Sequence, residues 1–190
     1  MEALLTSAAV VALAEIGDKT MLLAIVLSAR LHAPWQILAG IFCATILNHS
    51  LAALVGSEAA GLIDAPWFRM AVALGFIAMA LWTLIPDKLD DDEEGFKQRG
   101  GAFLTTLVSF FFVEMGDKTQ IATIALGARY HSVLAVAAGT TLGMMLANGP
   151  AVLLGEGLVK RISLKATRTA AALLFLALGL WQLAGVLGWL

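Results

Sequence analysis

Glu15-Ile16-Gly17-Asp18-Lys19-Thr20 is a six-residue motif that this chain contains twice, because Glu114-Met115-Gly116-Asp117-Lys118-Thr119 repeats it with one change. Each copy places two carboxylates, one ammonium and one hydroxyl in a stretch that is otherwise apolar. Ionisable side chains are costly in lipid-like surroundings, and where they occur they mark functional sites. The two copies are therefore the candidate functional site of the protein.

The composition is that of a membrane protein. Of the 190 residues, 60% are hydrophobic and 14% are charged, whereas about a quarter of the residues of a soluble domain are charged. The single cysteine, Cys43, excludes an intrachain disulfide and a thiolate-rich metal site. No basic region follows Met1, so we expect no cleaved signal peptide.

Apolar segments predict an all-α membrane protein with six transmembrane helices. A spanning helix needs about 20 mostly apolar residues. Segments of that kind lie at 4–28, 34–57, 67–85, 102–127, 133–156 and 168–189. The first and fourth contain the two motif copies.

The chain is an internal duplication with an offset of 99 residues. Besides the motif, the pairs that share a residue type at this offset are Arg30/Arg129, His32/His131, Gly40/Gly139, Gly56/Gly155, Arg69/Arg168, Phe76/Phe175 and Trp82/Trp181. Self-similarity at a fixed offset indicates a structural repeat. We predict a three-helix repeat at 1–86, an acidic linker at 87–101 and a second three-helix repeat at 102–190.

The repeats are expected to have inverted topology. Three spans per repeat is an odd number, so the second repeat enters the membrane from the opposite side, as in many secondary transporters. Eight of the lysines and arginines flank one face and two flank the other. Because positive charge favours the cytoplasmic side, we predict a cytoplasmic linker and extracytoplasmic termini.

The motif spacing predicts how each copy works. On a helix, residues three and four apart share a face, which would align Glu15, Asp18 and Lys19. Gly17 and Gly116 would loosen their helices, and a broken helix is tolerated at membrane depth only where it is buried or lines a cavity. The side chains that would cap the following half-helix are Asp18 or Thr20, and Asp117 or Thr119.

The motif charges predict a cation site shared by the two repeats. Four carboxylates and two ammoniums sum to −2 when all are ionised, which one divalent cation or two protons would neutralise. Oxygen ligands suit Mg²⁺, Ca²⁺ and Mn²⁺. The expected core ligands are Glu15, Asp18, Glu114 and Asp117. Further candidate ligands are Gln120, Asn48, Asn148, Thr20, Thr119 and His49, with Lys19 and Lys118 balancing charge.

Several of these residues also have structural interpretations. The glutamates could form buried ion pairs within their own copies, Glu15 with Lys19 and Glu114 with Lys118. Hydroxyls could bond to helix carbonyls, and the amides of Asn48 and Asn148 could bond between helices. His49 could be a core histidine.

The doubled E-x-G-D-[KR]-[TS] motif in a six-span inverted repeat resembles the family of Golgi and bacterial manganese and calcium transporters, which includes the MneA-type bacterial manganese exporters. The resemblance covers nearly the whole chain. It implies cation/proton exchange that lowers cytoplasmic Mn²⁺ or Ca²⁺, with Glu15, Asp18, Glu114 and Asp117 as ligands. It also implies a bacterial inner membrane location.

Two other functions are weaker interpretations of the same residues. An exporter of another small solute, such as an amino acid, would need a carboxylate-binding and amine-binding pair. A lipid-phosphate hydrolase would need arginines and a nucleophile near the membrane face, and the only arginines in the predicted spans, Arg69 and Arg168, stand at span ends. We therefore expect a transporter and no enzyme. The expected partners are a divalent cation, protons and lipid, without cofactor or nucleic acid, and either a monomer or a homodimer fits the sequence.

Overall fold

The computed structural model describes residues 1–59, 65–85, 101–155 and 164–189, and every regular element in them is an α-helix, as predicted. The elements are α1 (Glu2–Glu15), α2 (Lys19–Leu31), α3 (Pro34–Ala59), α4 (Pro66–Thr83), α6 (Gly101–Glu114), α7 (Lys118–Tyr130), α8 (Val133–Leu154) and α10 (Leu164–Val186). The acidic part of the predicted linker lies outside the described residues; Gly101, its last residue, begins α6.

Four of the described helices are long and apolar enough to cross a membrane: α3, α4, α8 and the Lys165–Val186 part of α10. The first and fourth predicted spans are each divided into two half-helices instead, α1 with α2 and α6 with α7. Each half has 13 or 14 residues, which is too short to span a bilayer alone. The chain is a multi-pass membrane protein with two interrupted segments.

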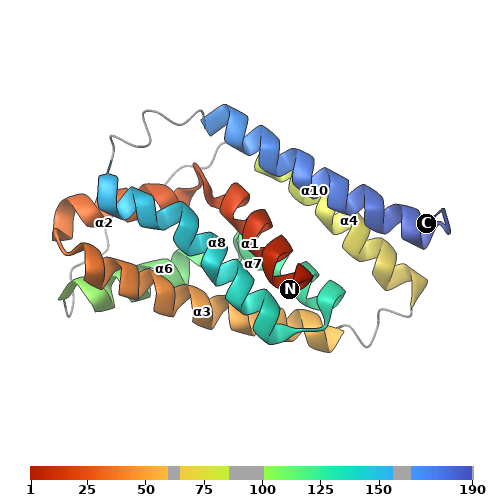
Figure 1. Ribbon diagram of the computed structural model, residues 1–190, viewed down its shortest axis with the longest axis horizontal. Coiled ribbons are helices and arrows are strands. Elements are labelled where there is room, and N and C mark those ends of the chain that lie inside the picture. The colour runs from red at the N-terminus through yellow and green to blue at the C-terminus, as the bar shows by residue number, and fades with distance from the viewer. Residues whose placement is uncertain (60–64, 86–100, 156–163, 190) are drawn as a thin grey trace.

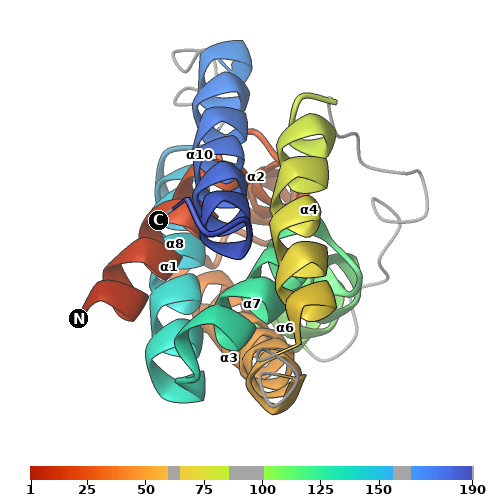
Figure 2. The same ribbon diagram turned by 90° about the vertical axis from the view of Figure 1, so that its right-hand side faces the viewer.

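The helices form a central bundle with a helix pair on one side (Figures 1 and 2). In the bundle α3 packs on α8, α1 and α2 pack on α8, and α6 and α7 pack on α3. The third helices of the two halves, α4 and α10, pack on each other. This pair covers the bundle at α7 and α1, so it lies over one half of each interrupted segment.

The 99-residue repeat is visible in the packing. Phe76 of α4 stacks on Phe175 of α10, its own counterpart, with ring centroids 6.4 Å apart. Helices α2 and α7 both end in a left-handed histidine, His32 at φ 50° and His131 at φ 51°. Equal offsets therefore place equivalent residues in equivalent backbone conformations.

Glycines let the backbones of the bundle approach closely. A Cβ added to Gly40 would lie 2.8 Å from the carbonyl oxygen of Phe103 in α6. Its counterpart Gly139 meets the carbonyl oxygen of Leu4 in α1, the residue equivalent to Phe103. Small residues at such crossings are characteristic of membrane helix packing. These contacts fix α1 and α6, and with them the two motif copies, against the bundle centre.

Candidate functional site

Both motif copies interrupt their helices at the glycine, as predicted. Gly17 has φ 87° and Gly116 has φ 79°, a left-handed region that glycine enters without steric cost. The next residues, Asp18 and Asp117, are extended and occupy the N-cap positions of α2 and α7. Neither aspartate side chain makes a capping hydrogen bond, so both carboxylates are available to other groups.

All four motif acids are buried in the interior of the bundle, and three of them, without Asp18, form one close group. Glu15 and Glu114 are fully buried, and Asp18 and Asp117 nearly so. Carboxylate oxygens of Glu15, Glu114 and Asp117 lie within 4.8 Å of one another. The explanation from a shared helical face is wrong, because each glutamate ends one half-helix and each aspartate begins the next. The break brings the acids together.

The motif lysines pair across the repeats. Lys118 Nζ lies 3.4 Å from Asp18 Oδ1, and Lys19 Nζ lies 3.9 Å from Asp117 Oδ1. The alternative considered from the sequence, in which each lysine pairs with the glutamate of its own copy, missed these crossed pairs. Each pair joins one repeat to the other, which the spacing within a single copy cannot reveal.

The two glutamates each keep one oxygen uncommitted. Thr20 donates a hydrogen bond to Glu15 Oε2, and Thr119 donates to Glu114 Oε2 at 3.3 Å. The Oε1 atoms of both glutamates are buried without a hydrogen-bond partner among the described residues. A buried, unpaired carboxylate oxygen is energetically costly, so both atoms are suited to accept a cation or a proton.

His49, a candidate nitrogen ligand, lies beside the acids. Its Nε2 lies 3.6 Å from Glu114 Oε2, and the ring is fully buried. Neither ring nitrogen has a hydrogen-bond partner in the part of the chain that the structure describes. Both ring nitrogens are therefore available, and Nε2 already lies beside the carboxylate of Glu114.

The three amide side chains that are candidate ligands differ in the hydrogen bonds that they make. Asn48 donates to the carbonyl of Phe111 at 2.9 Å, an interhelical bond, and Gln120 Oε1 accepts from the Gly116 amide at 2.7 Å. Asn148 donates to the carbonyl of Met144 at 3.2 Å, while its Oδ1 is buried without a described partner. Gln120 therefore has its oxygen engaged and Asn48 its amide nitrogen, while Asn148 keeps an oxygen available.

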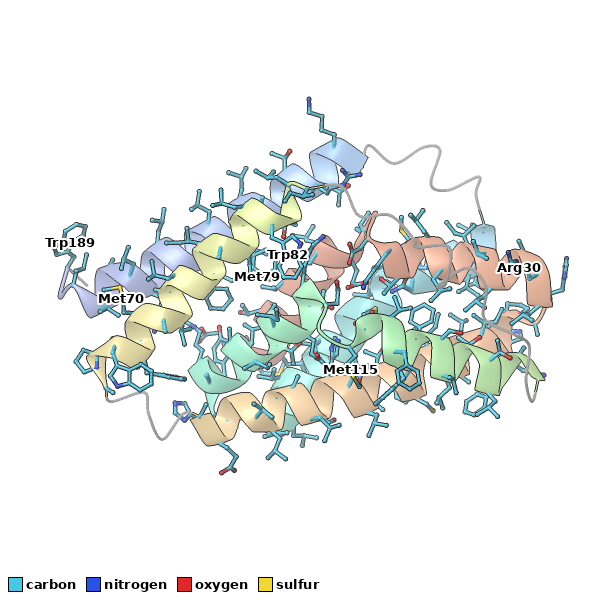
Figure 3. The ribbon with its side chains drawn as sticks, turned by 180° about the vertical axis from the view of Figure 1, so that it is seen from behind. Arg30, Met70, Met79, Trp82, Met115 and Trp189 are labelled. Atoms are coloured by element: carbon cyan, nitrogen blue, oxygen red, sulfur yellow. The ribbon has the colours of Figure 1, made fainter. Side chains whose placement is uncertain are left out.

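Sequence reasoning missed Trp82, which it identified only as one of the residues repeated at the 99-residue offset. The ammonium of Lys118 lies 5.9 Å from the centre of the Trp82 ring, and Figure 3 shows Trp82 near the end of α4 that approaches the broken helices. A tryptophan face within about 6 Å of a cation attracts it. The repetition of tryptophan at Trp82 and Trp181 was the feature of the sequence that could have pointed to it. The sequence does not tell which of the two side chains reaches a motif copy.

The charged groups of the site form two sets, the crossed lysine and aspartate pairs and the two glutamates. With all groups ionised, the crossed lysine and aspartate pairs cancel, and the two glutamates carry the remaining −2. One divalent cation or two protons would balance that charge. The arrangement is chemically able to exchange one for the other.

Comparisons with known proteins agree with this chemistry. The model of the family described as "Divalent cation/proton antiporter GDT1" matches residues 3–91 and 102–188, one match in each half of the chain. The chain is 46% identical over 181 residues to a Vibrio cholerae protein named "Putative manganese exporter", covering 95% of this chain and 90% of that protein. It is 30% identical to "GDT1-like protein 5" of Arabidopsis thaliana, with 93% of each chain covered. No solved structure matches the chain.

Proposed function

Because the chain belongs to the GDT1 family of divalent cation/proton antiporters, we propose that it exports Mn²⁺ from the cytoplasm in exchange for protons. The family assignment agrees with the expectation from the doubled motif, and it makes the protein a transporter and not an enzyme. The name of the Vibrio cholerae relative supports manganese as the exported ion.

The observation that carries the proposal is the pair of buried glutamates contributed by opposite repeats. Each has one carboxylate oxygen without a partner in the described structure, in a site where both lysines already pair with aspartates. Two protons on the glutamates, or one divalent cation between them, give the same net charge. Because leaving both carboxylates bare would be costly, binding one substrate and releasing the other are coupled.

We assign the metal ligands to both motif copies. Glu15, Glu114 and Asp117 form the core, because their oxygens already lie within 4.8 Å of one another, and Asp18 completes the set of acids. His49 and Asn148 are the further ligands that the geometry favours. Ca²⁺ takes oxygen ligands, whereas Mn²⁺ is a transition-metal ion that also accepts an imidazole nitrogen, so His49 supports Mn²⁺ over Ca²⁺ as the preferred ion.

The proposed architecture is two inverted three-helix repeats, residues 1–86 and 102–190, joined by the acidic linker. Stacking of Phe76 on its counterpart Phe175 is expected for residues on a twofold axis between the repeats. The equivalent contacts of Gly40 and Gly139 with α6 and α1 support the same relation. Each family-model match corresponds to one repeat.

The proposed location is a bacterial inner membrane, with the linker in the cytoplasm and both termini outside. The bacterial relative supports the membrane, and the excess of lysine and arginine on the linker side supports the orientation. In this orientation export moves Mn²⁺ from the linker side to the side of the termini.

The proposal is tested with purified protein in proteoliposomes that contain a pH-sensitive dye. A Mn²⁺ gradient should drive proton movement in the opposite direction, with Ca²⁺ and Mg²⁺ as comparison ions. Glu15→Gln and Glu114→Gln should each abolish this coupling, because each removes one charge from the exchanging pair.

Glu58→Gln is the matched control, since Glu58 is an exposed glutamate at the end of α3, and it should leave transport unchanged. Metal flux that moves no protons, or full coupling in both glutamate variants, would contradict the proposal. Flux of an amino acid without metal flux would favour the solute-exporter alternative.

A further inference from the structure

We propose that the Lys118 ammonium and the transported divalent cation are alternative partners of Asp18, so that Lys118 acts as a built-in competitor that weakens metal binding and promotes release. The inference rests on the proposed function, because it assigns a role to a residue beside the proposed metal ligands. This role differs from charge balance, because any nearby cation that stays in place would balance the charge of the acids without competing for Asp18.

Asp18 is positioned to hold either cation. One carboxylate oxygen, Oδ1, lies 3.4 Å from Lys118 Nζ, and the other, Oδ2, is buried without a hydrogen-bond partner in the described residues. Both side chains are about as buried as a core residue, with 2% of Asp18 and 3% of Lys118 exposed. Water is therefore a poor substitute for either partner.

A divalent cation bound by the acids would repel this ammonium. Lys118 follows the proposed core ligand Asp117 directly in the chain, and the Asp18 amide bonds to the carbonyl of Glu15, a second core ligand. Charges placed close together interact strongly where little water screens them. A metal bound through Oδ2 alone would still repel the nearby ammonium, and a metal that takes both oxygens of Asp18 displaces Lys118 from Oδ1. Metal binding at Asp18 and the Asp18 to Lys118 ion pair therefore oppose each other.

Trp82 leaves Lys118 with a partner when a metal takes Asp18. The ring centre lies 5.9 Å from Nζ, at the end of α4 that reaches the broken helices (Figure 3), so the ammonium lies over the ring while it is paired with Asp18. The cation–π attraction of tryptophan therefore continues to stabilise the ammonium once the carboxylate is lost, and the long flexible stem of a lysine allows the small shift.

Lys19 provides an internal comparison. Its ammonium is farther from Asp117, at 3.9 Å, and 21% of its side chain is exposed. A more exposed ammonium is better screened and competes less with a metal. The same residue at the same motif position should therefore have a weaker effect on affinity.

The test is Mn²⁺ binding to the purified full-length protein, measured by calorimetry, together with turnover in proteoliposomes. Lys118→Gln removes the competing charge and keeps a polar group beside Asp18. We expect its Kd for Mn²⁺ to fall about tenfold, in the range that groups supporting metal ligands contribute, and its turnover to fall because release slows. Lys19→Gln should change the Kd less.

Lys118→Arg is the second variant, because it keeps the charge and pairs with a carboxylate through two donors. It should bind Mn²⁺ more weakly than the unchanged protein. If Lys118→Gln destabilises the fold, the rise in melting temperature on adding Mn²⁺ should still be larger than for the unchanged protein, because the metal takes the place of the missing ammonium.

The inference would be overturned if Lys118→Gln bound Mn²⁺ no more tightly than the unchanged protein, or if Lys118→Arg bound it as tightly as the unchanged protein. Either result would leave the proposed antiport intact. Failure of the unchanged protein to bind Mn²⁺ or to couple it to protons would overturn the proposed function, and this inference with it. A tighter Kd with slower turnover supports the inference, since a purely structural lysine would not improve binding when removed.

Discussion

The two motif copies have nearly the same sequence and backbone but different surroundings. Asp18 and Asp117 have almost equal dihedral angles, and both follow a left-handed glycine. Yet Gly17 is buried and Gly116 is exposed, while Lys118 is enclosed and Lys19 is partly exposed. The difference teaches that the motif sets the break in the helix, whereas packing around it sets the role of each charged group.

The third helices are the source of this asymmetry. Trp82 of α4 lies over Lys118 at the second motif, but its counterpart Trp181 of α10 lies against Arg129 at the end of α7, 5.5 Å from its ring centre. Gln182, next in the chain, bonds to Arg129 at 2.8 Å. Equivalent tryptophans thus contact different parts of the same half-helix, and it is Trp82 that lies over the motif lysine at its start.

The largest expected effect compares the two crossed ion pairs. Asp18→Asn removes the carboxylate that pairs with the buried Lys118 ammonium, and breaking a buried pair costs about 3–5 kcal/mol. Asp117→Asn should cost clearly less, because Lys19 is partly exposed. Unfolding of each variant in detergent measures the difference. Equal losses would mean that the two copies are energetically equivalent despite their different burial.

The next effect compares the two equivalent glycine contacts. Gly139→Ala would push a methyl group against the carbonyl of Leu4, and Gly40→Ala would place one 2.8 Å from that of Phe103. Overpacking of this kind costs about 1–3 kcal/mol, and Gly139→Ala should lie at the upper end because its contact is tighter. Melting temperatures in detergent test the order, with Gly75→Ala as a control at a site with open space.

A smaller effect concerns ion preference and compares His49 with Asn148, which occupy equivalent positions in the two repeats. His49→Asn makes the second helices of the repeats alike and replaces a nitrogen ligand by oxygen, which favours Ca²⁺ over Mn²⁺. We expect the Mn²⁺ preference over Ca²⁺ to fall on the order of tenfold. Competition between the two ions in the proteoliposome assay measures this ratio, and an unchanged ratio would exclude His49 as a ligand.

The smallest effect compares the motif hydroxyls. Thr20 donates to Glu15, while Thr119 is shared between Glu114 and Asp117 at 3.3 and 3.4 Å, which is long for a hydroxyl donor. Thr20→Val should cost about 1 kcal/mol of stability, and Thr119→Val less. Unfolding measurements on the two variants decide the order. The opposite order would mean that Thr119 holds its carboxylates more firmly than these distances indicate.

Much of the fold and site was predictable from composition and repetition. Long apolar segments identified α3, α4, α8 and α10, and the glycine of each motif indicated the break. The acids were identified because charge in an apolar segment is rare. The crossed lysine pairs and the role of Trp82 were not predictable, since they depend on contacts between residues about 36 to 100 positions apart.

The sequence by itself determined the local properties of this protein: an all-α chain built from a repeat, with two glycine breaks and two sets of charged residues. Those properties follow from apolar length, from the freedom of glycine and from the cost of charge in lipid. Only the tertiary structure decided which oxygens face one another, which lysine is enclosed and which tryptophan covers it. The physical reason is that burial and pairing depend on neighbours from distant helices, and two copies of one motif receive different neighbours.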